Sequence, residues 1–342
     1  MKFLYTTDLH GRANNPISRL DDYPKTVLKK LNWVIDTANE NGDFLLCGGD
    51  WLNRPDTSPS FIGDLAAALM RLDKKPCYTI LGNHDLYGYN TNSFMRTPLY
   101  ILERIGIICI LDENNPVVIS DENAIVALTG ASASYDIDGE DKKHYIAKKV
   151  PNVDKHIHLT HGFLTDKPWP LVPHTLIKDI LGTEADIVLS GHEHSGFGVV
   201  RKNNKLFCNP GSLLRVTAGI GDVGMTVRVF ELDISREAVT DRFINCPETI
   251  ALPSDIVLDR AKLLEEKAHE EKMLTFFSDL AAVDIDELDT TDVFTLFRAF
   301  AEKEEIGQDI QNEVIRRLAI ASERNLREEV DGDEGASGTD PV

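Results

Sequence analysis

Five short groups of aspartate, asparagine and histidine stand out in the N-terminal part of the sequence. In chain order they are Asp8-Leu9-His10, Gly48-Gly49-Asp50, Gly82-Asn83-His84-Asp85, Thr160-His161-Gly162 and Gly191-His192-Glu193-His194. Their oxygen and imidazole donors suit manganese, iron or zinc, whereas calcium prefers oxygen ligands alone. There are too many donors for one ion, and about enough for two ions that share a bridging carboxylate. These residue types therefore predict a two-metal site.

Each group directly follows an apolar run that is typical of a β-strand. The runs are Phe3–Thr7, Phe44–Cys47, Tyr78–Leu81, Ile157–Thr160 and Ile187–Ser190. Because the carboxyl ends of strands in an open α/β sheet share one edge, we expect the five groups to converge there. A single Asp-x-His group is usually a surface feature, but five groups at strand ends in this order have no simple structural explanation. In an extended chain, Asp8 and His10 would also point the same way.

Strands and helical segments alternate through the first 250 residues. Further strands are predicted at Ile107–Leu111, Ala124–Thr129, Gly198–Arg201, Lys205–Cys208, Met225–Leu232 and Val239–Asn245. Val27, Leu31 and Val34 share one helical face with Ile35 and Ala38. Phe61, Leu65, Ala68, Leu69 and Leu72 form a second such face. The alternation indicates an α/β layer architecture.

The sequence changes character after Pro253. Helices are predicted at Ser254–Leu280 and Thr291–Glu329, and the last residues are rich in Gly, Asp, Glu and Ser. We therefore expect a catalytic domain at 1–250, a helical accessory or docking region at 251–330, and a disordered acidic tail at 331–342.

The charge balance limits the classes of partner. The net charge is −20, and residues 251–342 carry 24 acidic and 10 basic side chains. This argues against broad nucleic-acid binding through a basic surface, although a metal-filled cleft can still attract phosphate. No apolar run is long enough to cross a bilayer, so no membrane association is expected. Five cysteines without a Cys-x-x-Cys pair favour a reduced, cytoplasmic compartment.

The order of the five groups resembles the calcineurin-like metallophosphoesterases, over about residues 1–230. The resemblance implies an α/β fold, a four-layer αββα sandwich of two mixed sheets flanked by helices, here with a helical C-terminal extension. It implies two divalent ions, most simply Mn²⁺, with Fe, Zn, Ni or Mg as alternatives. It also implies in-line attack of a bridging hydroxide on a phosphodiester.

The resemblance also implies a role for each residue of the five groups. Asp8, His10 and His194 would hold the first metal, and Asn83, His161 and His192 the second. Asp50 would bridge both metals. His84 would be the catalytic acid that protonates the leaving oxygen, and Asp85 would orient the His84 ring.

Within this superfamily the sequence is most similar to the SbcD-type DNA-repair nuclease subunit. The similarity lies in Gly82-Asn83-His84-Asp85, in Asn209-Pro210-Gly211-Ser212 and in the charged helical segment that begins near Leu288. It implies a DNA exonuclease or endonuclease that docks a coiled-coil SMC-like ATPase through its C-terminal helices, or forms a homodimer. Asn53 departs from that family, which more often has Asp or His there.

Two other functions stay open. One is a small-molecule or cyclic-nucleotide phosphodiesterase or phosphatase, and the other is a non-catalytic, metal-binding partner protein. A protein phosphatase is disfavoured, because Leu81 stands before Gly82 where those enzymes carry a phosphate-binding arginine. Tyr87 and Tyr89 are expected either to pack or to stack a base, and Trp51 is expected to cover the Asp50 loop.

Overall fold

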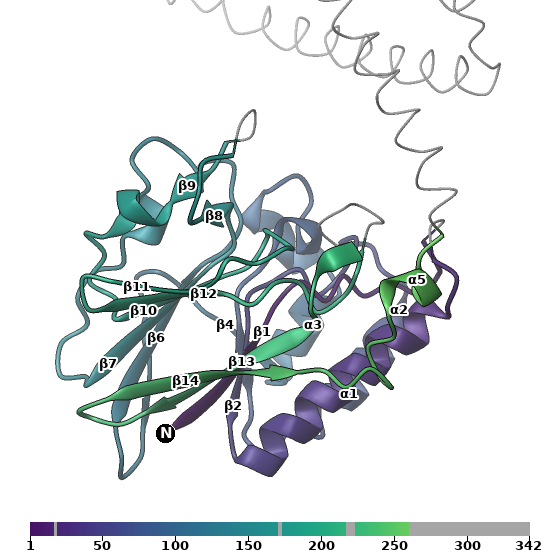
Figure 1. The fold of residues 1–342 in the computed structure, drawn as a ribbon, viewed down its shortest axis with the longest axis horizontal. Coiled ribbons are helices and arrows are strands. Elements are labelled where there is room, and N and C mark those ends of the chain that lie inside the picture. Colours follow the sequence, from purple (N-terminus) through teal and green to yellow (C-terminus); the bar gives the residue numbers. More distant parts are fainter. Residues whose placement is uncertain (17–18, 170–172, 217–222, 260–342) are drawn as a thin grey trace, which may run out of the picture. The chain divides into compact units, whose positions relative to one another are not determined.

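The structure, a computed structural model, describes residues 1–16, 19–169, 173–216 and 223–259. Two six-stranded sheets face each other in this part of the chain (Figure 1). The first sheet has the order β14 (Val239–Asn245), β13 (Arg228–Ile234), β1 (Lys2–Thr6), β2 (Phe44–Cys47), β3 (Cys77–Thr79) and β4 (Ile108–Ile110). The second has the order β11 (Gly198–Lys202), β12 (Lys205–Asn209), β10 (Ile187–Ser190), β7 (Lys155–Thr160), β6 (Ile125–Ala131) and β5 (Val117–Ser120).

Both sheets are mixed, and each contains four neighbouring parallel strands and two antiparallel strands. In the first, β1 to β4 are parallel, and β13 and β14 add an antiparallel ribbon. In the second, β12, β10, β7 and β6 are parallel, and β11 and β5 are antiparallel edge strands. The parallel strands β1, β2, β3, β7 and β10 each end just before one of the five polar groups. The topology therefore brings these groups to the carboxyl edges of both sheets.

Side chains that alternate along the strands build two cores. In β1, Phe3 and Tyr5 pack between the two sheets, whereas Leu4 packs toward the helices. In β10, Leu189 packs between the sheets and Val188 packs on the outer side of the second sheet. Period-two alternation in strands that are buried on both faces thus fixes the register of each sheet.

Helices cover the outer face of the first sheet. They are α1 (Tyr23–Asn41), α2 (Pro59–Leu69) and the short α3 (Leu99–Arg104). The Asp22 side chain caps α1 by accepting the Lys25 N–H, and Gly42 ends the helix in the left-handed conformation. The second sheet is covered instead by short 3-10 turns, η3 (Lys143–Tyr145) and η4 (Ile177–Ile180), beside the small β8 (Leu164–Thr165) and β9 (Thr175–Leu176) pair.

The predicted fold class of two mixed sheets flanked by helices is confirmed. Each predicted strand overlaps an observed one, although the strand expected from Met225 begins at Arg228. The sequence reasoning missed β5, β8, β9 and α3. β5 is an edge strand with half-exposed side chains, and the other three elements are too short to show a clear period.

The described residues include only the start of the helices predicted after Pro253. The helix expected over Ser254–Leu280 begins as α5 (Ser254–Val257) but ends there, because Leu258 is extended and pairs with Arg19 in an antiparallel bridge. The rest of that helix, the Thr291–Glu329 helix and the tail at 331–342 lie outside the described residues. Among the described residues, no helix is long and apolar enough to cross a membrane.

Helix α1 carries a buried lysine that contacts a loop near the five polar groups. Lys30 Nζ donates a hydrogen bond to the Leu213 carbonyl at 2.9 Å. Burial, and then the charge of Arg215, lower the pKa of Lys30 to about 7. The unfolded chain, with an ordinary lysine pKa, therefore binds this proton more tightly, and stability rises with pH above about pH 7.

We predict that Lys30→Met weakens the pH dependence of folding. Between about pH 7 and 8.5, the wild type should gain roughly 1–2 kcal/mol of unfolding free energy relative to this variant. Urea unfolding at the two pH values measures the difference, from which contributions common to both proteins cancel. Lys29→Met changes an exposed lysine of the same helix and should leave the slope unchanged. Equal slopes for Lys30→Met and the wild type would show that Lys30 stays protonated when buried.

Candidate metal centre

The loops after β1 and β2 run side by side and carry three of the predicted ligands. The Asp8 amide donates to the Gly49 carbonyl at 3.1 Å, and the His10 amide donates to the Asp50 carbonyl at 2.8 Å. The expectation that Asp8 and His10 share a face of an extended chain is wrong, because their φ angles are 55° and 46°. The left-handed backbone, rather than strand alternation, aims both side chains inward.

Left-handed backbone recurs at other residues of the five groups. Asp50 has φ 52° and His192 has φ 76°. Such conformations cost non-glycine residues on the order of 1–3 kcal/mol each and tend to persist where function requires them. Four strained residues where the carboxyl edges of the two sheets meet therefore mark this place as a functional site.

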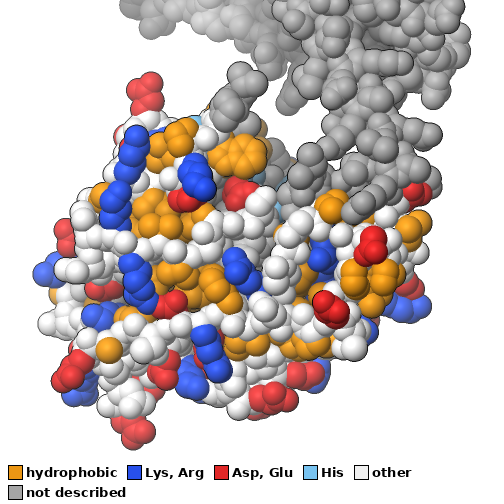
Figure 2. All heavy atoms as spheres, viewed as in Figure 1, with side chains coloured by type: hydrophobic (Ala, Val, Ile, Leu, Met, Phe, Trp, Pro, Cys, Tyr) orange, Lys and Arg blue, Asp and Glu red, His pale blue; other side chains and the backbone are white. Residues whose placement is uncertain are grey.

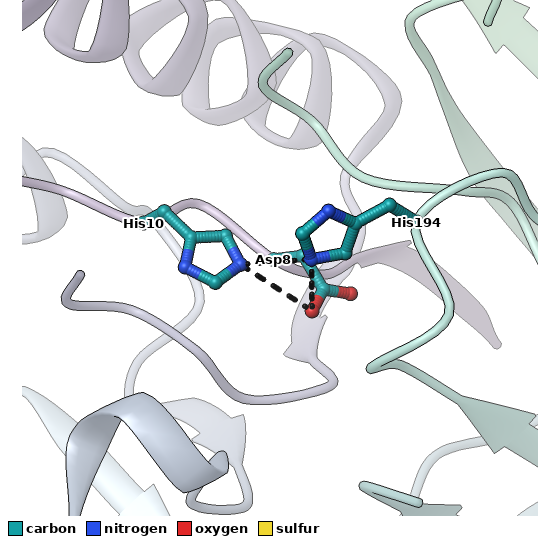
Figure 3. Close-up of side chains that lie close together, drawn as sticks. All are labelled: Asp8, His10 and His194. Atoms are coloured by element: carbon teal, nitrogen blue, oxygen red, sulfur yellow. Dashed lines mark hydrogen bonds and ion pairs between the residues drawn. The ribbon is translucent and has the colours of Figure 1, made fainter. Parts of the chain in front are cut away.

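Asp8, His10 and His194 form the first ligand group, with both rings directed at the Asp8 carboxylate (Figure 3). The Asp8 Oδ1 atom lies 3.8 Å from His10 Nε2 and 3.7 Å from His194 Nε2. The two Nε2 atoms lie 3.0 Å from each other. Asp8 and His10 are buried, so these lone pairs converge in a space that water does not fill freely.

Asp50, His161 and His192 form the second ligand group, together with Asn83. The Asn83 Oδ1 atom lies 3.2 Å from His161 Nε2 and 3.0 Å from His192 Nδ1. His161 Nδ1 donates to the Gly48 carbonyl at 2.7 Å, which leaves Nε2 to face the centre.

The Asp50 carboxylate lies between the two groups. Its Oδ2 atom is 3.5 Å from His10 Nε2 and 3.3 Å from His161 Nε2. Its Oδ1 atom accepts the His84 backbone N–H at 2.9 Å. All seven predicted ligands thus meet at one place, and the carboxylate predicted to bridge them lies in the middle. That they hold ions stays a prediction.

The donor set fits two divalent transition ions. Each group offers carboxylate oxygen and imidazole nitrogen within 4.8 Å, the mixture that manganese, iron and zinc accept. The surrounding backbone leaves room only for glycine, since a Cβ atom on Gly82 would lie 1.9 Å from Asp50 Oδ1. A Cβ atom on Gly49 would lie 2.7 Å from the Gly82 nitrogen. The backbone at Gly49 and Gly82 therefore packs closely around the Asp50 carboxylate.

Burial and neighbouring charges shift the pKa values of the donors in the centre in different directions. Burial raises the pKa of Asp50, but His161 and then His10 more than reverse this and hold it well below its usual value. Burial, and then His161, lower the pKa of His192 to about 4. Against burial, the Asp50 charge raises the pKa of His161 to about 9. A cation that binds near neutral pH must therefore displace a proton from His161.

His84 and Asp85 have different partners from those predicted. His84 lies at the edge of the centre with His10 and Asp50, and its Nδ1 atom lies 2.9 Å from the Asn53 carbonyl oxygen. The expectation that Asp85 orients this ring is wrong. The buried Asp85 carboxylate instead accepts the backbone N–H groups of Trp51, Leu52 and Gly82, so it holds the Asp50 loop in place.

The Asn209–Ser212 loop, which the sequence analysis used as a sign of similarity to SbcD-type nucleases, supports the first ligand group. Ser212 Oγ donates to the Asp8 carbonyl at 2.9 Å, and the Ser212 amide donates to the His194 carbonyl at 2.9 Å. Asn209 Nδ2 donates to the Glu193 carbonyl at 2.8 Å. The Asn-Pro-Gly-Ser signal was visible in the sequence, but it identifies a positioning loop behind the ligands.

Three further side chains near the five groups have partners outside the centre. Trp51 is buried and donates from Nε1 to Thr79 Oγ1 at 2.8 Å, so the expectation of a covering ring is wrong. Arg54 is exposed and pairs with Asp56. Arg215 is buried, and its guanidinium donates to backbone carbonyls of residues 225 and 252.

Comparison with known proteins identifies a family. The model of the calcineurin-like phosphoesterase family matches residues 1–196. No curated protein matches the chain. Solved structures similar to it include Haemophilus influenzae NAD nucleotidase, at 15% identity and a TM-score of 0.41 over 72% of this chain and 49% of that one. The chain thus spans about half the length of that protein.

Two smaller proteins match along nearly all of their length. A predicted phosphoesterase from Streptococcus pneumoniae has 14% identity and a TM-score of 0.30, over 72% of this chain and 97% of that one. Vacuolar protein sorting 29 from Cryptosporidium parvum has 15% identity and a TM-score of 0.33, over the same shares.

We predict that the protein binds two divalent ions and that Asp50→Ala loses both, because this carboxylate faces both groups.

Asp85→Asn removes no predicted ligand, but the side-chain amide of this variant cannot accept all three of the backbone N–H groups that the Asp85 carboxylate accepts. It should weaken Mn²⁺ binding by about 10–100-fold. Titration calorimetry and elemental analysis measure affinity and content, with exposed Asp56→Ala as the control. Two ions retained by Asp50→Ala would contradict the bridging position.

Proposed function

The chain belongs to the calcineurin-like phosphoesterase family, and we propose that it hydrolyses phosphodiester bonds with two bound divalent ions. The Asp50 carboxylate, between one group containing Asp8, His10 and His194 and another containing His161 and His192, carries this proposal. When bound, such a pair of ions lowers the pKa of water and stabilises negative charge on a phosphoryl group. Mn²⁺ is the proposed ion, as the family resemblance implies, and the mixture of carboxylate, amide and imidazole donors also suits iron and zinc.

His84 is the residue proposed to move a proton. Its Nδ1 atom faces the Asn53 carbonyl, which fixes Nδ1 as the hydrogen-bond donor of the ring. When the ring carries a proton on both nitrogens, Nε2 is the one that can donate its proton to the leaving oxygen of a substrate and become neutral. The contact uses the Asn53 backbone, so the departure of the Asn53 side chain from the SbcD pattern does not disturb it.

The proposed substrate is DNA, in the manner of an SbcD-type exonuclease or endonuclease. The Gly82-Asn83-His84-Asp85 sequence and the Asn209–Ser212 loop support this likeness. The net charge of −20 opposes tight DNA binding, and basic and acidic side chains alternate on the face drawn in Figure 2. We therefore expect the isolated chain to bind DNA weakly and to cut it in a metal-dependent reaction.

Under this function, residues 251–330 would dock a partner that supplies affinity for DNA. The partner would be a coiled-coil SMC-like ATPase or a second copy of the chain. The acidic bias of this region suits contact with a basic protein surface better than contact with DNA.

A small-molecule phosphodiesterase is the second candidate, and the acidic balance of the chain favours it. A cyclic nucleotide or another small ester needs no extended basic surface, because the bound ions can supply the positive charge that it meets. A non-catalytic role fits less well, since both ligand groups and the proton donor candidate are present.

We predict that His84→Asn keeps both ions but loses turnover by about 10²–10⁴-fold on a diester with a poor leaving group. The loss should shrink with a good leaving group, which needs no proton. Steady-state kinetics with a matched pair of esters measures both effects. His144→Asn changes a histidine bonded to Glu113 outside the metal centre, and it should keep most activity. Unchanged turnover of poor leaving groups by His84→Asn would remove His84 from the mechanism.

We predict that the wild type with Mn²⁺ cleaves linear or single-stranded DNA in a side-by-side assay with a cyclic nucleotide and a phosphomonoester. Product analysis on a gel and by chromatography measures all four reactions. Efficient cleavage of the cyclic nucleotide or the monoester, with DNA left intact, would support the small-molecule function instead. Wild type depleted of metal is the control and should be inactive on every substrate.

A further inference from the structure

Among the described residues, exposed aromatic side chains gather near the loops that carry the predicted metal ligands. Tyr87, Tyr89, Tyr135 and Trp169 are the aromatic residues among the large exposed hydrophobic side chains, with exposed fractions of 37%, 36%, 81% and 45%. Tyr87 and Tyr89 follow β3, Tyr135 follows β6, and Trp169 lies between β8 and β9. Exposed rings that gather in a patch often mark a binding site, and these lie near the loops that carry the predicted metal ligands.

One aromatic pair lies beside the loop of Asn83 and His84. The rings of Tyr89 and Tyr135 have centroids 5.3 Å apart and planes tilted by 36°. Gly88 and Tyr89 both have positive φ, which turns the chain so that Tyr89 meets Tyr135. Burial, and then the Asp50 charge, raise the pKa of Tyr89, so its hydroxyl lies within electrostatic reach of the metal centre.

The second pair lies beside a metal ligand. Phe163 and Trp169 have ring centroids 5.4 Å apart, and Phe163 lies 5.9 Å from the His192 ring. The planes of both contacts are nearly perpendicular. Trp169 therefore extends an aromatic surface outward from a ring that already touches the metal centre.

Asp138 ties the loops of the two pairs together. Its Oδ2 atom accepts the Phe163 backbone N–H at 2.9 Å. Its Oδ1 atom accepts the Tyr145 hydroxyl at 2.8 Å and the Thr175 hydroxyl at 2.6 Å. The segment of Tyr135 and the segment of Phe163 thus hold fixed positions around the centre, as a preformed binding surface requires.

We propose that Tyr89, Tyr135, Phe163 and Trp169 form a rim that stacks the nucleobase next to the scissile phosphate. This inference rests on the proposed phosphodiesterase function and assigns it a substrate class, the nucleoside-containing phosphodiesters. Flat aromatic faces stack any of the bases and need no positive charge, which suits an acidic protein that must hold a nucleotide beside its metals. A substrate without a planar base gains nothing from such a rim.

The test compares two diesters with one leaving group, thymidine 5′-(p-nitrophenyl phosphate) and methyl p-nitrophenyl phosphate. With Mn²⁺, the wild type should prefer the nucleoside ester in kcat/KM by about 5- to 150-fold, the range of base stacking on aromatic residues. Trp169→Ala and Tyr135→Ala should each reduce this preference and leave metal content and the rate on the methyl ester unchanged. Trp169→Phe and Tyr135→Phe should restore it, and Tyr100→Ala, in α3, should have no effect.

A binding measurement separates this inference from the proposed function. Thymidine 5′-monophosphate and 2-deoxyribose 5-phosphate differ only in the base, and titration calorimetry on the Mn²⁺-loaded chain should show tighter binding of the first. Equal affinity for both, or a base preference that survives Trp169→Ala and Tyr135→Ala, overturns the rim. Absence of hydrolysis with a base preference intact would instead overturn the phosphodiesterase function and leave the rim standing.

Discussion

The burial of the Asp50 carboxylate is the constraint on which the rest of the site depends. A buried anion is costly unless charges or hydrogen bonds surround it. Here the His10 and His161 nitrogens lie 3.5 and 3.3 Å from one oxygen, and the His84 amide donates to the other. The backbone must come close enough to make these contacts, which explains the glycine at position 82 and the left-handed turn at Asp50 itself. Two positive ions would satisfy the same carboxylate more fully than protons on the imidazoles do, which supports the prediction that this site holds cations.

A second layer of contacts keeps this arrangement in place. Asp85 holds the Asp50 loop through three backbone N–H groups, and Ser212 links the backbones of Asp8 and His194. These residues touch no predicted substrate or ion, yet they determine the geometry of the atoms that do. The loop of Ser212 is held in turn by Lys30 of α1. The helix layer on the first sheet is thereby connected to the metal-bearing edge, so stability and function share the same contacts.

Much of the fold and the set of converging residues could be predicted from the sequence, for a physical reason. Apolar runs followed at once by Asp, Asn or His mark strand ends, and parallel strands bring their ends to one edge. The side-chain directions could not be predicted, because Asp and His adopt left-handed backbone more often than most residues but still seldom, so residue type does not fix the conformation of Asp8 and His10. The partner of Asp85 was also hidden, since a carboxylate next to His84 in sequence suggests a side-chain contact, whereas the turn points it at backbone amides. Short elements such as α3 and β5 were missed because few residues and half-exposed faces give no period.

An acidic chain can bind the proposed DNA substrate if one part of the site binds the phosphate and another part binds the base. Phosphate needs positive charge, and ions held by the two ligand groups would supply that charge without a basic protein surface. A base needs a flat apolar face, and Tyr135 and Trp169 offer this at the rim of the same centre. Neither source needs a basic surface, and neither depends on salt as strongly as rows of lysine and arginine would. Under the proposed function, such a chain would bind the one nucleotide next to its two ions well and the rest of a DNA polymer poorly, so a partner protein would have to supply affinity for long DNA.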